Sequence, residues 1–529
     1  MTHLLIGGRV HSPTHPDATA IAVRDGVVAW LGSDDVGRAQ FPEAEVFDVG
    51  GAFVAPAFVD SHVHVTATGL TLTGVDLRGA RSREECLRLL ADHARAHPDG
   101  PLWAHGWDDT RWPRAVAPTT DDIDDAVGNR PAYLARVDVH SAAASTALRQ
   151  TVAGLAARAG FHPQNPLTSD AHHDVRAVAR NLLTADQRAI ARRAALDAAA
   201  SLGIVAVHEC AGPDIGGLAD WAELRGTEHG VDVVGYWGQA VTTADEARAL
   251  LDETEARGLA GDLFVDGALG SHTAWLAEPY ADADHCGNHY LESDSIAAHV
   301  QACTDAGIPA GFHAIGDAAT SAVVDAFAAV VERRGVSVVA RCGHRLEHIE
   351  MVTAEQAARL GSWGVIASVQ PNFDALWGGP SGMYAERLGA QRGRQLNPLA
   401  LLASEGVPLA FGSDTPVTSM NPWMTVRAAA HHRTDGSAVS ARAAFAAATR
   451  GGWRAAGVRD GQTGTLAPGA QASYAVWETG PLAVTAPRDA IQRWSTDPRA
   501  RVPLLPRLAS GDPVPRCVRT VHRGEVIYG

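Results

Sequence analysis

The sequence predicts an α/β protein in which a parallel sheet with helical crossovers occupies the middle of the chain and both chain ends join a small β-unit. From about residue 55, apolar strand-like runs alternate with Ala-rich helical segments, the pattern of consecutive βα units. Short alternating strands beside Gly turns recur at both termini. The composition agrees, because 46% hydrophobic and 20% charged residues are typical of a folded globular chain.

The two chain ends are expected to form one small β-sandwich. Near the N-terminus, two alternating runs flank Asp25-Gly26, a dipeptide that favours a tight hairpin turn. Near the C-terminus, strand-like runs again lie beside Gly turns. We therefore predict that residues 1–55 and residues 465–529 build this unit together.

Residues 56–464 are expected to hold the parallel sheet. The Ala-rich segment 318–334 is one of several helical stretches that follow apolar runs. Between His64 and the strand-like run 203–208 there is more chain than one βα unit needs. We predict that an insertion within about residues 66–180 caps the pocket of this domain.

The composition excludes several classes of partner. Sixty acidic against 44 basic residues give a net charge of −16 without a basic run, so we expect neither nucleic acid nor an anionic membrane as a partner. No apolar run approaches the length that crosses a bilayer, and residues 1–10 lack a secretory signal. The six cysteines form no CxxC pair, as is usual for reduced thiols. These features predict a cytoplasmic location.

Two histidines at the end of an apolar run are the first candidates for chemistry. His62 and His64 follow the run 52–59 and are separated by one residue. Alternate side chains of a strand share a face, so both imidazoles can grip one metal ion. In a chain with 24 His, such a pair alone is a weak signal.

Later strand-like runs end in the same residue types. His313, His348 and Asp414 each close or follow an apolar run. Histidine and carboxylate are the ligands of hard or borderline divalent metals, and they converge where parallel strands end. The pattern therefore predicts a centre for zinc or another divalent metal.

Six ordered motifs extend this interpretation over most of the chain: APAFVDSHVH, VDGALGSHTA, FHAIGDAA, RLEHIE, FGSDTPV and GTLAPGAQASYAVWE. With them the chain resembles the amidohydrolase superfamily, specifically its family 3 branch, the group that includes N-substituted formamide deformylases. The resemblance implies a metal-dependent hydrolase on a (β/α)8 barrel, a TIM-like barrel, beside a β-sandwich of both termini. It also implies attack on a C–N bond and, from family habit, a homodimer.

The resemblance assigns roles to the candidate residues. His62, His64 and Asp414 would bind the metal, and Asp414 would also act as the general acid/base. His313 and His348 resemble the ligands of a second metal. Alternatively, His313 completes a single tight site while His348 hydrogen-bonds the substrate carbonyl or the water. Two further acidic residues, Asp317 and Glu347, either orient these imidazoles or are surface charges.

One departure from the family matters for the metal. The sequence contains no Lys, so the carboxylated lysine that bridges two metals in many relatives is impossible here. Asp262 stands at that position, four residues before Asp266, and its carboxylate ends roughly 5 Å short of the lysine's reach. Either its backbone lies closer to the metal, or it bridges through water, or the site holds one metal firmly. We expect one tight metal site, with a weaker second one optional.

Four residues are candidates for contact with the substrate. His140 matches a His-Ser segment of the family, and Trp107 matches its Gly-Trp-Asp segment. His272 stands where this branch often has Arg. Trp377 is one of several tryptophans that suit the wall of an apolar pocket.

The first hypothesis is thus an amidohydrolase that cleaves an amide, an N-formyl group or a related C–N bond of a small molecule through metal-activated water. A mononuclear-zinc aminohydrolase, a deaminase of a heterocycle, is the second hypothesis. It usually needs a Glu as proton shuttle after the fifth-strand histidine, where this chain has Asp317 at a different spacing. The third is a barrel that has lost catalysis and serves as a binding module.

Overall fold

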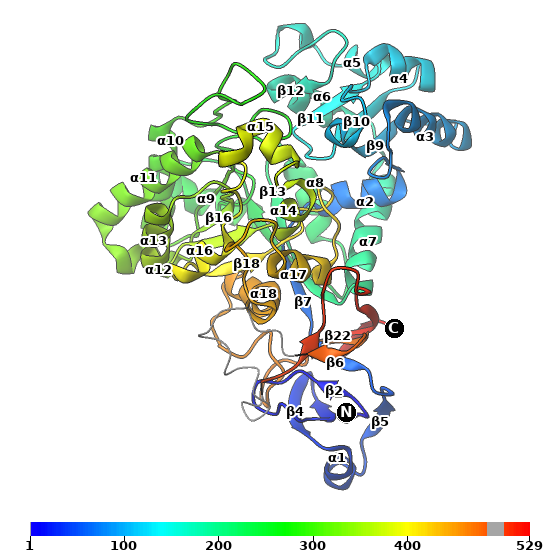
Figure 1. Ribbon diagram of the computed structural model, residues 1–529, viewed down its shortest axis with the longest axis vertical. Helices are drawn as coiled ribbons and strands as arrows, with labels where there is room; N and C mark the ends of the chain where they lie inside the picture. The colour runs from blue at the N-terminus through cyan, green and yellow to red at the C-terminus, as the bar shows by residue number, and fades with distance from the viewer. Residues whose placement is uncertain (1, 484–501) are drawn as a thin grey trace.

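The computed structural model describes residues 2–483 and 502–529, so part of the predicted C-terminal β-unit lies outside the described residues. Within these ranges the chain has a mixed α/β architecture (Figure 1). The strands are β1 (Thr2–Ile6), β2 (Arg9–Val10), β3 (Ala20–Arg24), β4 (Val27–Gly32), β5 (Glu45–Asp48), β6 (Phe53–Pro56), β7 (Phe58–Val63), β8 (Val75–Asp76), β9 (Leu102–Trp107), β10 (Ala132–Arg136), β11 (Ser141–Ala144), β12 (Leu167–Thr168), β13 (Ile204–Ala211), β14 (Asp232–Trp237), β15 (Gly311–Ala314), β16 (Arg345–His348), β17 (Ile366–Val369), β18 (Leu409–Phe411), β19 (Tyr474–Glu478), β20 (Leu482–Ala483), β21 (Leu505–Pro506), β22 (Arg516–His522) and β23 (Glu525–Tyr528).

Helices connect most of the parallel strands. The α-helices are α1 (Asp34–Gln40), α2 (Val65–Thr73), α3 (Arg83–Ala96), α4 (Thr120–Val127), α5 (Thr146–Arg149), α6 (Ser169–Asn181), α7 (Ala185–Ser201), α8 (Gly217–Arg225), α9 (Ala244–Thr254), α10 (Ser293–Ala306), α11 (Asp317–Arg334), α12 (Val336–Cys342), α13 (Ala354–Trp363), α14 (Pro371–Trp377), α15 (Met383–Arg392), α16 (Leu399–Ser404), α17 (Pro422–Ala430), α18 (Ala441–Ala446) and α19 (Gly452–Ala455). Short 3-10 turns lie at Asp109–Arg111 and Leu155–Ala157, and a π-helix covers Ala447–Gly451. The predicted helix 318–334 is confirmed as α11.

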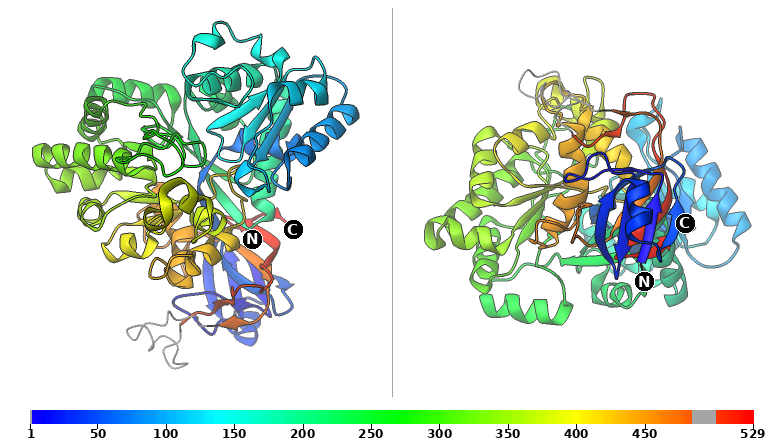
Figure 2. Two further views of the ribbon diagram at one scale, coloured as in Figure 1. Left: turned by 45° about the horizontal axis from the view of Figure 1, so that its top comes forward. Right: turned by 90° about the horizontal axis from the view of Figure 1, so that it is seen from below.

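Strands from the two chain ends share one sheet. Its order is β2-β6-β19-β22-β23, while β4-β3-β1-β5 form a second sheet from N-terminal residues alone. One hydrophobic cluster contains residues of both sheets, among them Ile21 and Tyr474. The predicted hairpin is confirmed, because Asp25 and Gly26 connect β3 to β4 with positive φ angles of 51° and 76°. The two chain ends therefore lie close together, as Figures 1 and 2 show.

The parallel strands lie in two sheets, β14-β13-β7 and β15-β16-β17-β18. In the described chain they do not close into one continuous barrel, which differs from the expected closed sheet. Instead, isolated parallel bridges connect the sheets at Tyr236↔Gly258, Leu259↔Ala310, Phe264↔His313 and Val63↔Thr415. The ladder is interrupted because the chain between Leu259 and Phe264 bulges away from regular pairing.

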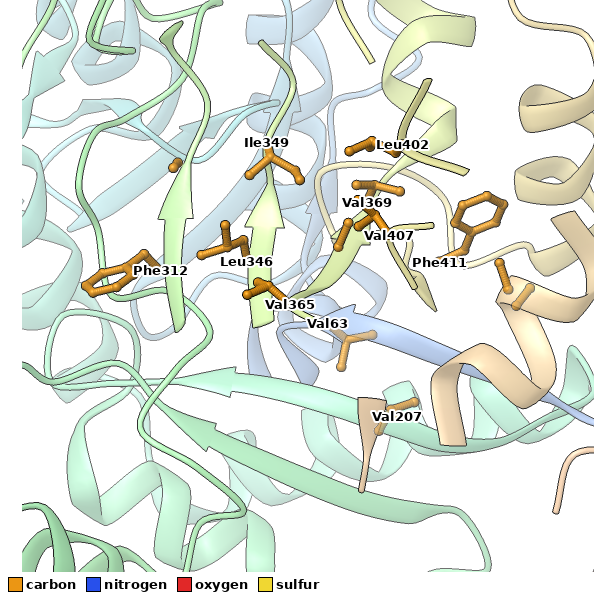
Figure 3. Close-up of a cluster of buried hydrophobic side chains, with 14 of the residues drawn as sticks. Val63, Val207, Phe312, Leu346, Ile349, Val365, Val369, Leu402, Val407 and Phe411 are labelled. Atoms are coloured by element: carbon orange, nitrogen blue, oxygen red, sulfur yellow. The ribbon is translucent and has the colours of Figure 1, made fainter. Parts of the chain in front are cut away.

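Apolar residues alternate with polar ones along these strands, and the apolar side chains pack against the helices that cover the sheets. Phe312, Leu346 and Phe411 belong to one large cluster that also contains Phe327 of α11 and Leu360 of α13. Figure 3 shows the first three on strands of one sheet, together with Val63 and Val369. Since side chains alternate across a strand, His313 and Glu347 point to the opposite face. The fold thus places polar residues on the inner side of the parallel strands.

A separate sheet, β12-β11-β10-β9-β8, lies within the segment predicted as an insertion. It mixes parallel and antiparallel pairs and has two hydrophobic clusters of its own. Figures 1 and 2 show it beside the parallel strands, flanked by α3, α4 and α6. Among the described helices, none combines the length and the apolar character needed to cross a bilayer.

Candidate metal centre

Four side chains converge where the parallel strands end. His62 is the penultimate residue of β7, His64 directly follows this strand, and Asp414 follows β18. The fourth, Asp262, comes from the irregular segment between the two parallel sheets. All four are buried, with at most 6% of their surface exposed. The structure therefore brings the first three predicted ligands together with the residue at the lysine position.

The donor atoms of these side chains are evenly spaced. His62 Nε2 lies 3.4 Å from Asp262 Oδ1 and 3.4 Å from Asp414 Oδ1. His64 Nε2 lies 3.2 Å from Asp262 Oδ2 and 3.3 Å from Asp414 Oδ1. Two ligand atoms that are each about 2.1 Å from a tetrahedral zinc are about 3.4 Å apart. The spacing of these four groups fits a divalent metal.

Buried atoms without hydrogen-bond partners support the same conclusion. Among the described residues, His62 Nε2 and Asp262 Oδ1 are buried without a hydrogen-bond partner. Buried polar atoms are rarely left unsatisfied in folded proteins. A metal ion between them would satisfy both atoms, so the residues present fit such an ion.

The charges at this centre also favour a cation. Burial lowers the pKa of His64, but hydrogen bonds and charge from Asp262 and Asp414 raise it to about 9. Burial raises the pKa of Asp262, whereas His62 and His64 lower it well below its usual value. Two buried carboxylates thus face two imidazoles, and positive charge is stabilised between them.

A local bulge explains how Asp262 reaches the centre. Between the bridges Leu259↔Ala310 and Phe264↔His313, residues 260–263 lie opposite only two residues of β15. The extra residues bend the chain inward, as β-bulges do. Gly238 permits this approach, because a Cβ atom there would lie 2.6 Å from the Asp262 carbonyl group. The Asp262 carboxylate thus comes within 3.2–3.4 Å of His62 Nε2 and His64 Nε2.

Glu347 lies behind His62 rather than on the surface. Its Oε2 is 2.9 Å from His62 Nδ1, and its side chain is fully buried. Arg345 donates to both carboxylate oxygens, at 2.5 Å and 2.8 Å. A carboxylate on one ring nitrogen orients the other nitrogen of the imidazole toward the metal position. Asp317, by contrast, accepts a hydrogen bond from the backbone of Ala277 at 2.9 Å.

His313 and His348 lie next to this group. Their ring centroids are 4.4 Å apart, and the ring of His348 is 5.0 Å from that of His62. Donor atoms of His62, His348 and Asp414 lie within 4.8 Å of one another. Among the described residues, His313 Nδ1 has no hydrogen-bond partner. These two imidazoles are therefore placed to serve a second metal or the substrate.

Gln370 is a site residue that the sequence interpretation missed. Its Oε1 is 2.8 Å from His348 Nδ1, and its amide donates to the Ser368 carbonyl at 3.5 Å. Burial, and then the neighbouring His313 and His62, lower the pKa of His348 well below its usual value. The neutral ring donates from Nδ1, so Nε2 carries a free lone pair. Gln370 directly follows β17, and this strand-end position was the available signal.

Two pockets open beside these residues, and both are lined by His140, His313, His348 and Asp414. The α6 pocket is further lined by Trp103, Tyr133, His173, Arg176, Arg180 and Phe264. The aromatic pocket is further lined by Ile315, Glu350, Phe373, Trp377, Met383 and Tyr384. The structure thus brings two predicted substrate residues, His140 and Trp377, to the centre.

The other two predicted substrate residues lie elsewhere. Trp107 is 1% exposed, packs within the separate five-stranded sheet, and donates its indole N–H to the Leu134 carbonyl at 2.9 Å. His272 hydrogen-bonds Asp282 Oδ1 at 3.0 Å. Neither of them lines the α6 pocket or the aromatic pocket. Neither the match of Trp107 to a family segment nor the departure at His272 was enough to place these side chains.

Comparisons with known proteins agree with this architecture. The sequence model of the amidohydrolase family matches residues 45–528. The chain is 26% identical over 502 residues to the protein LONG AFTER FAR-RED 3 of Arabidopsis thaliana, covering 88% of this chain and 84% of that protein. It is also 26% identical over 446 residues to an N-substituted formamide deformylase of Arthrobacter pascens, covering 77% of this chain and 78% of that enzyme.

A solved structure shares the fold. The crystal structure of an uncharacterized metal-dependent hydrolase from Pyrococcus horikoshii OT3 matches with a TM-score of 0.70 at 24% sequence identity, covering 91% of this chain and 98% of that chain. At this identity the likeness concerns the fold.

Proposed function

The chain belongs to the amidohydrolase family, and from this premise we propose that it is a metal-dependent hydrolase of an amide, an N-formyl group or a related C–N bond in a small molecule. One observation carries the proposal: two imidazoles and two carboxylates meet with donor atoms 3.2–3.4 Å apart, and Asp414 among them lines two pockets. The formamide deformylase among the relatives supports the choice of bond.

In this proposal His62, His64, Asp262 and Asp414 hold one tightly bound zinc or another divalent ion. His313 and His348 then contact the substrate or hold a weaker second ion. When bound, such an ion polarises a carbonyl group and activates water. The orphaned His62 Nε2 and Asp262 Oδ1 support this ligand set.

The protein's own groups move the protons. Asp414 lies at both pockets, so its carboxylate can take a proton from the attacking water and return it to the leaving nitrogen. His348 is held by Gln370, and its free Nε2 lone pair accepts a hydrogen bond from the water. Both groups are buried, so bulk water does not compete with them.

The proposal includes the finer architecture. Strands β7, β13 and β14, the irregular segment 258–264 and strands β15 to β18 would occupy the eight strand positions of a (β/α)8 barrel. The isolated bridges between the two sheets and this segment support that arrangement. We propose residues 56–464 as this barrel, the insertion within about 66–180 as its cap, and residues 1–55 with 465–529 as a β-sandwich. A homodimer in the cytoplasm completes the proposal.

Hydrolysis with and without metal tests the function. We expect the purified protein to release amines from a panel of N-formyl, N-acetyl and N-benzoyl compounds, to lose this activity after dialysis against a chelator, and to regain it with zinc. His62→Ala should abolish both metal binding and turnover, whereas His97→Ala, at an exposed position on the end of α3, should change neither.

Two results would contradict the proposal. Ammonia release from adenine or cytosine, without cleavage of any panel member, would favour the aminohydrolase. Failure to bind zinc or to turn over any compound after reloading would favour the binding module. The structure does not favour the aminohydrolase, because Asp317, its nearest equivalent of a proton shuttle, lines neither pocket.

A further inference from the structure

The α6 pocket contains two arginines from a single helix. Arg176 and Arg180 are four residues apart on α6, so they lie on the same side of the helix. Both line the pocket that also contains Asp262, His313 and Asp414. Positive charge is thus built into the wall of the cavity that leads to the candidate metal centre.

Neither arginine has a carboxylate partner among the described residues. Arg176 is 7% exposed, its guanidinium donates to the Asp214 carbonyl, and its Nε has no hydrogen-bond partner there. Arg180 is half-buried, and its guanidinium forms no ion pair or hydrogen bond with the rest of the described chain. Buried charges are normally paired.

Three other buried arginines follow that rule, whereas Arg149 donates to four backbone carbonyls instead. Arg136 pairs with Asp138 at 2.6 Å, Arg192 pairs with Asp220 at 3.1 Å, and Arg345 pairs with Glu347. The two carboxylates that act electrostatically on Arg180, those of Asp220 and Glu209, already have other partners. Asp220 bonds Arg192 and Thr66, and Glu209 accepts the Val65 N–H at 2.7 Å. The pair on α6 thus has neither a carboxylate partner nor a comparable set of carbonyl acceptors among the described residues, and it faces a cavity.

We propose that Arg176 and Arg180 bind a carboxylate group of the substrate. A guanidinium matches a carboxylate with two parallel N–H···O bonds, and such charge-assisted bonds are the strong ones. The unpartnered Nε of Arg176 is one of the donors that the carboxylate would satisfy. His173, whose pKa is lowered to about 3 by burial and by Arg176, stays neutral beside them and adds no charge.

The second pocket defines the other end of the substrate. Phe373, Trp377, Met383 and Tyr384 make the aromatic pocket predominantly apolar. Since both pockets share His348 and Asp414, a molecule that fills both must place its middle at the metal centre. The substrate class is therefore an amide with a carboxylate on one side of the scissile bond and an apolar group on the other. This inference rests on the proposed function.

Matched pairs of compounds test the inference with the metal-loaded protein. N-formyl, N-acetyl and N-benzoyl derivatives of glycine and of both phenylalanine enantiomers are compared as free acids and as neutral primary amides. We expect the acids to be hydrolysed with a kcat/KM about 10- to 100-fold higher than their amides, the range that a hydrogen bond to a charged group contributes. Equal or better hydrolysis of the amides overturns the inference and leaves the proposed function intact.

Variants identify the residue responsible. Arg180→Gln should raise KM for the acids about tenfold or more with little change in kcat, and should leave the amides unchanged. Arg180→Lys should restore part of the difference. Arg158→Gln is the matched control, because the exposed Arg158 pairs with Asp174 of α6 and does not line the pocket. An unchanged acid-to-amide ratio in Arg180→Gln overturns the assignment.

Binding separates this inference from the proposed function. If no compound is turned over, calorimetric titration with N-benzoylglycine and N-benzoylglycinamide still decides the role of the arginines. Tighter binding of the acid to the wild type than to Arg180→Gln supports the carboxylate site even where hydrolysis fails. Equal affinity of the wild type for the acid and the amide overturns the inference, and so does equal affinity of the wild type and Arg180→Gln for the acid.

Discussion

Asp414→Asn is expected to lower kcat by about 10²–10⁴-fold while the protein keeps its fold and binds its metal at saturating zinc. The Asn side chain still offers an oxygen to a metal but cannot take a proton from water. In the structure Asp414 Oδ1 is 3.3–3.4 Å from both His62 Nε2 and His64 Nε2 and lies at both pockets. Steady-state kinetics and metal analysis on the same sample measure the two effects.

The backbone at this position accepts the substitution. Asp414 has a φ of 54°, a left-handed conformation that Asn adopts readily. Its N–H donates to the His62 carbonyl at 2.8 Å, and its own carbonyl accepts from Val417 at 2.7 Å. Neither bond involves the side chain, so we expect circular dichroism and thermal unfolding to match the wild type.

Asp317→Asn provides the matched control. Asp317 begins α11 four residues after His313, but its carboxylate bonds the Ala277 backbone instead of facing the centre. Its substitution should leave kcat nearly unchanged, because Asp317 lines neither pocket. Wild-type turnover in Asp414→Asn would refute the acid/base role, and a large loss in Asp317→Asn alone would point to the aminohydrolase.

Arg345→Met is expected to destabilise the protein by about 3–5 kcal/mol, the usual effect of leaving one partner of a buried ion pair without the other. Arg345 is fully buried and donates to Glu347, to the Ser61 carbonyl at 2.7 Å and to Ser368 Oγ at 2.8 Å. Its guanidinium carbon also lies 4.2 Å from the ring centroid of Tyr236. Methionine preserves much of the volume but removes every donor.

Calorimetric unfolding of metal-free samples measures this effect. Arg341→Met is the control, since the side chain of Arg341 is exposed near the same strand, and we expect a change within about 0.5 kcal/mol. The double variant Arg345→Met/Glu347→Gln should regain part of the loss, because it no longer leaves a buried charge. If Arg345→Met alone unfolds like the wild type, the pair has no structural role.

The candidate ligands could be predicted from the sequence because they follow a simple rule. His62, His64, His313, His348 and Asp414 each end or follow an apolar strand, and parallel strands end on one side of a sheet. Gln370 also follows an apolar strand, but its residue type alone does not indicate a role. Its hydrogen bond with His348 does. Glu347 remained ambiguous because alternation alone does not say which neighbour a carboxylate will contact.

Other features depend on geometry that no pattern in the sequence encodes. Asp262 reaches the centre because of a bulge in a segment that lacks regular strand pairing. The residue types of this segment do not predict the bulge. Trp107 matched a family segment, yet its ring packs inside a different sheet. Arg176 and Arg180 are far from the candidate ligands in sequence, so their place in the pocket wall follows from the tertiary position of α6.

Metal analysis of the wild type and of Asp262→Ala tests the central claim most directly. The claim is that Asp262, brought inward by the bulge, is a ligand of one tight metal site. Elemental analysis of protein purified without added metal should then give about one zinc per wild-type chain and far less than that in the variant. An equal zinc content in both proteins would contradict it and would make Asp262 a bystander.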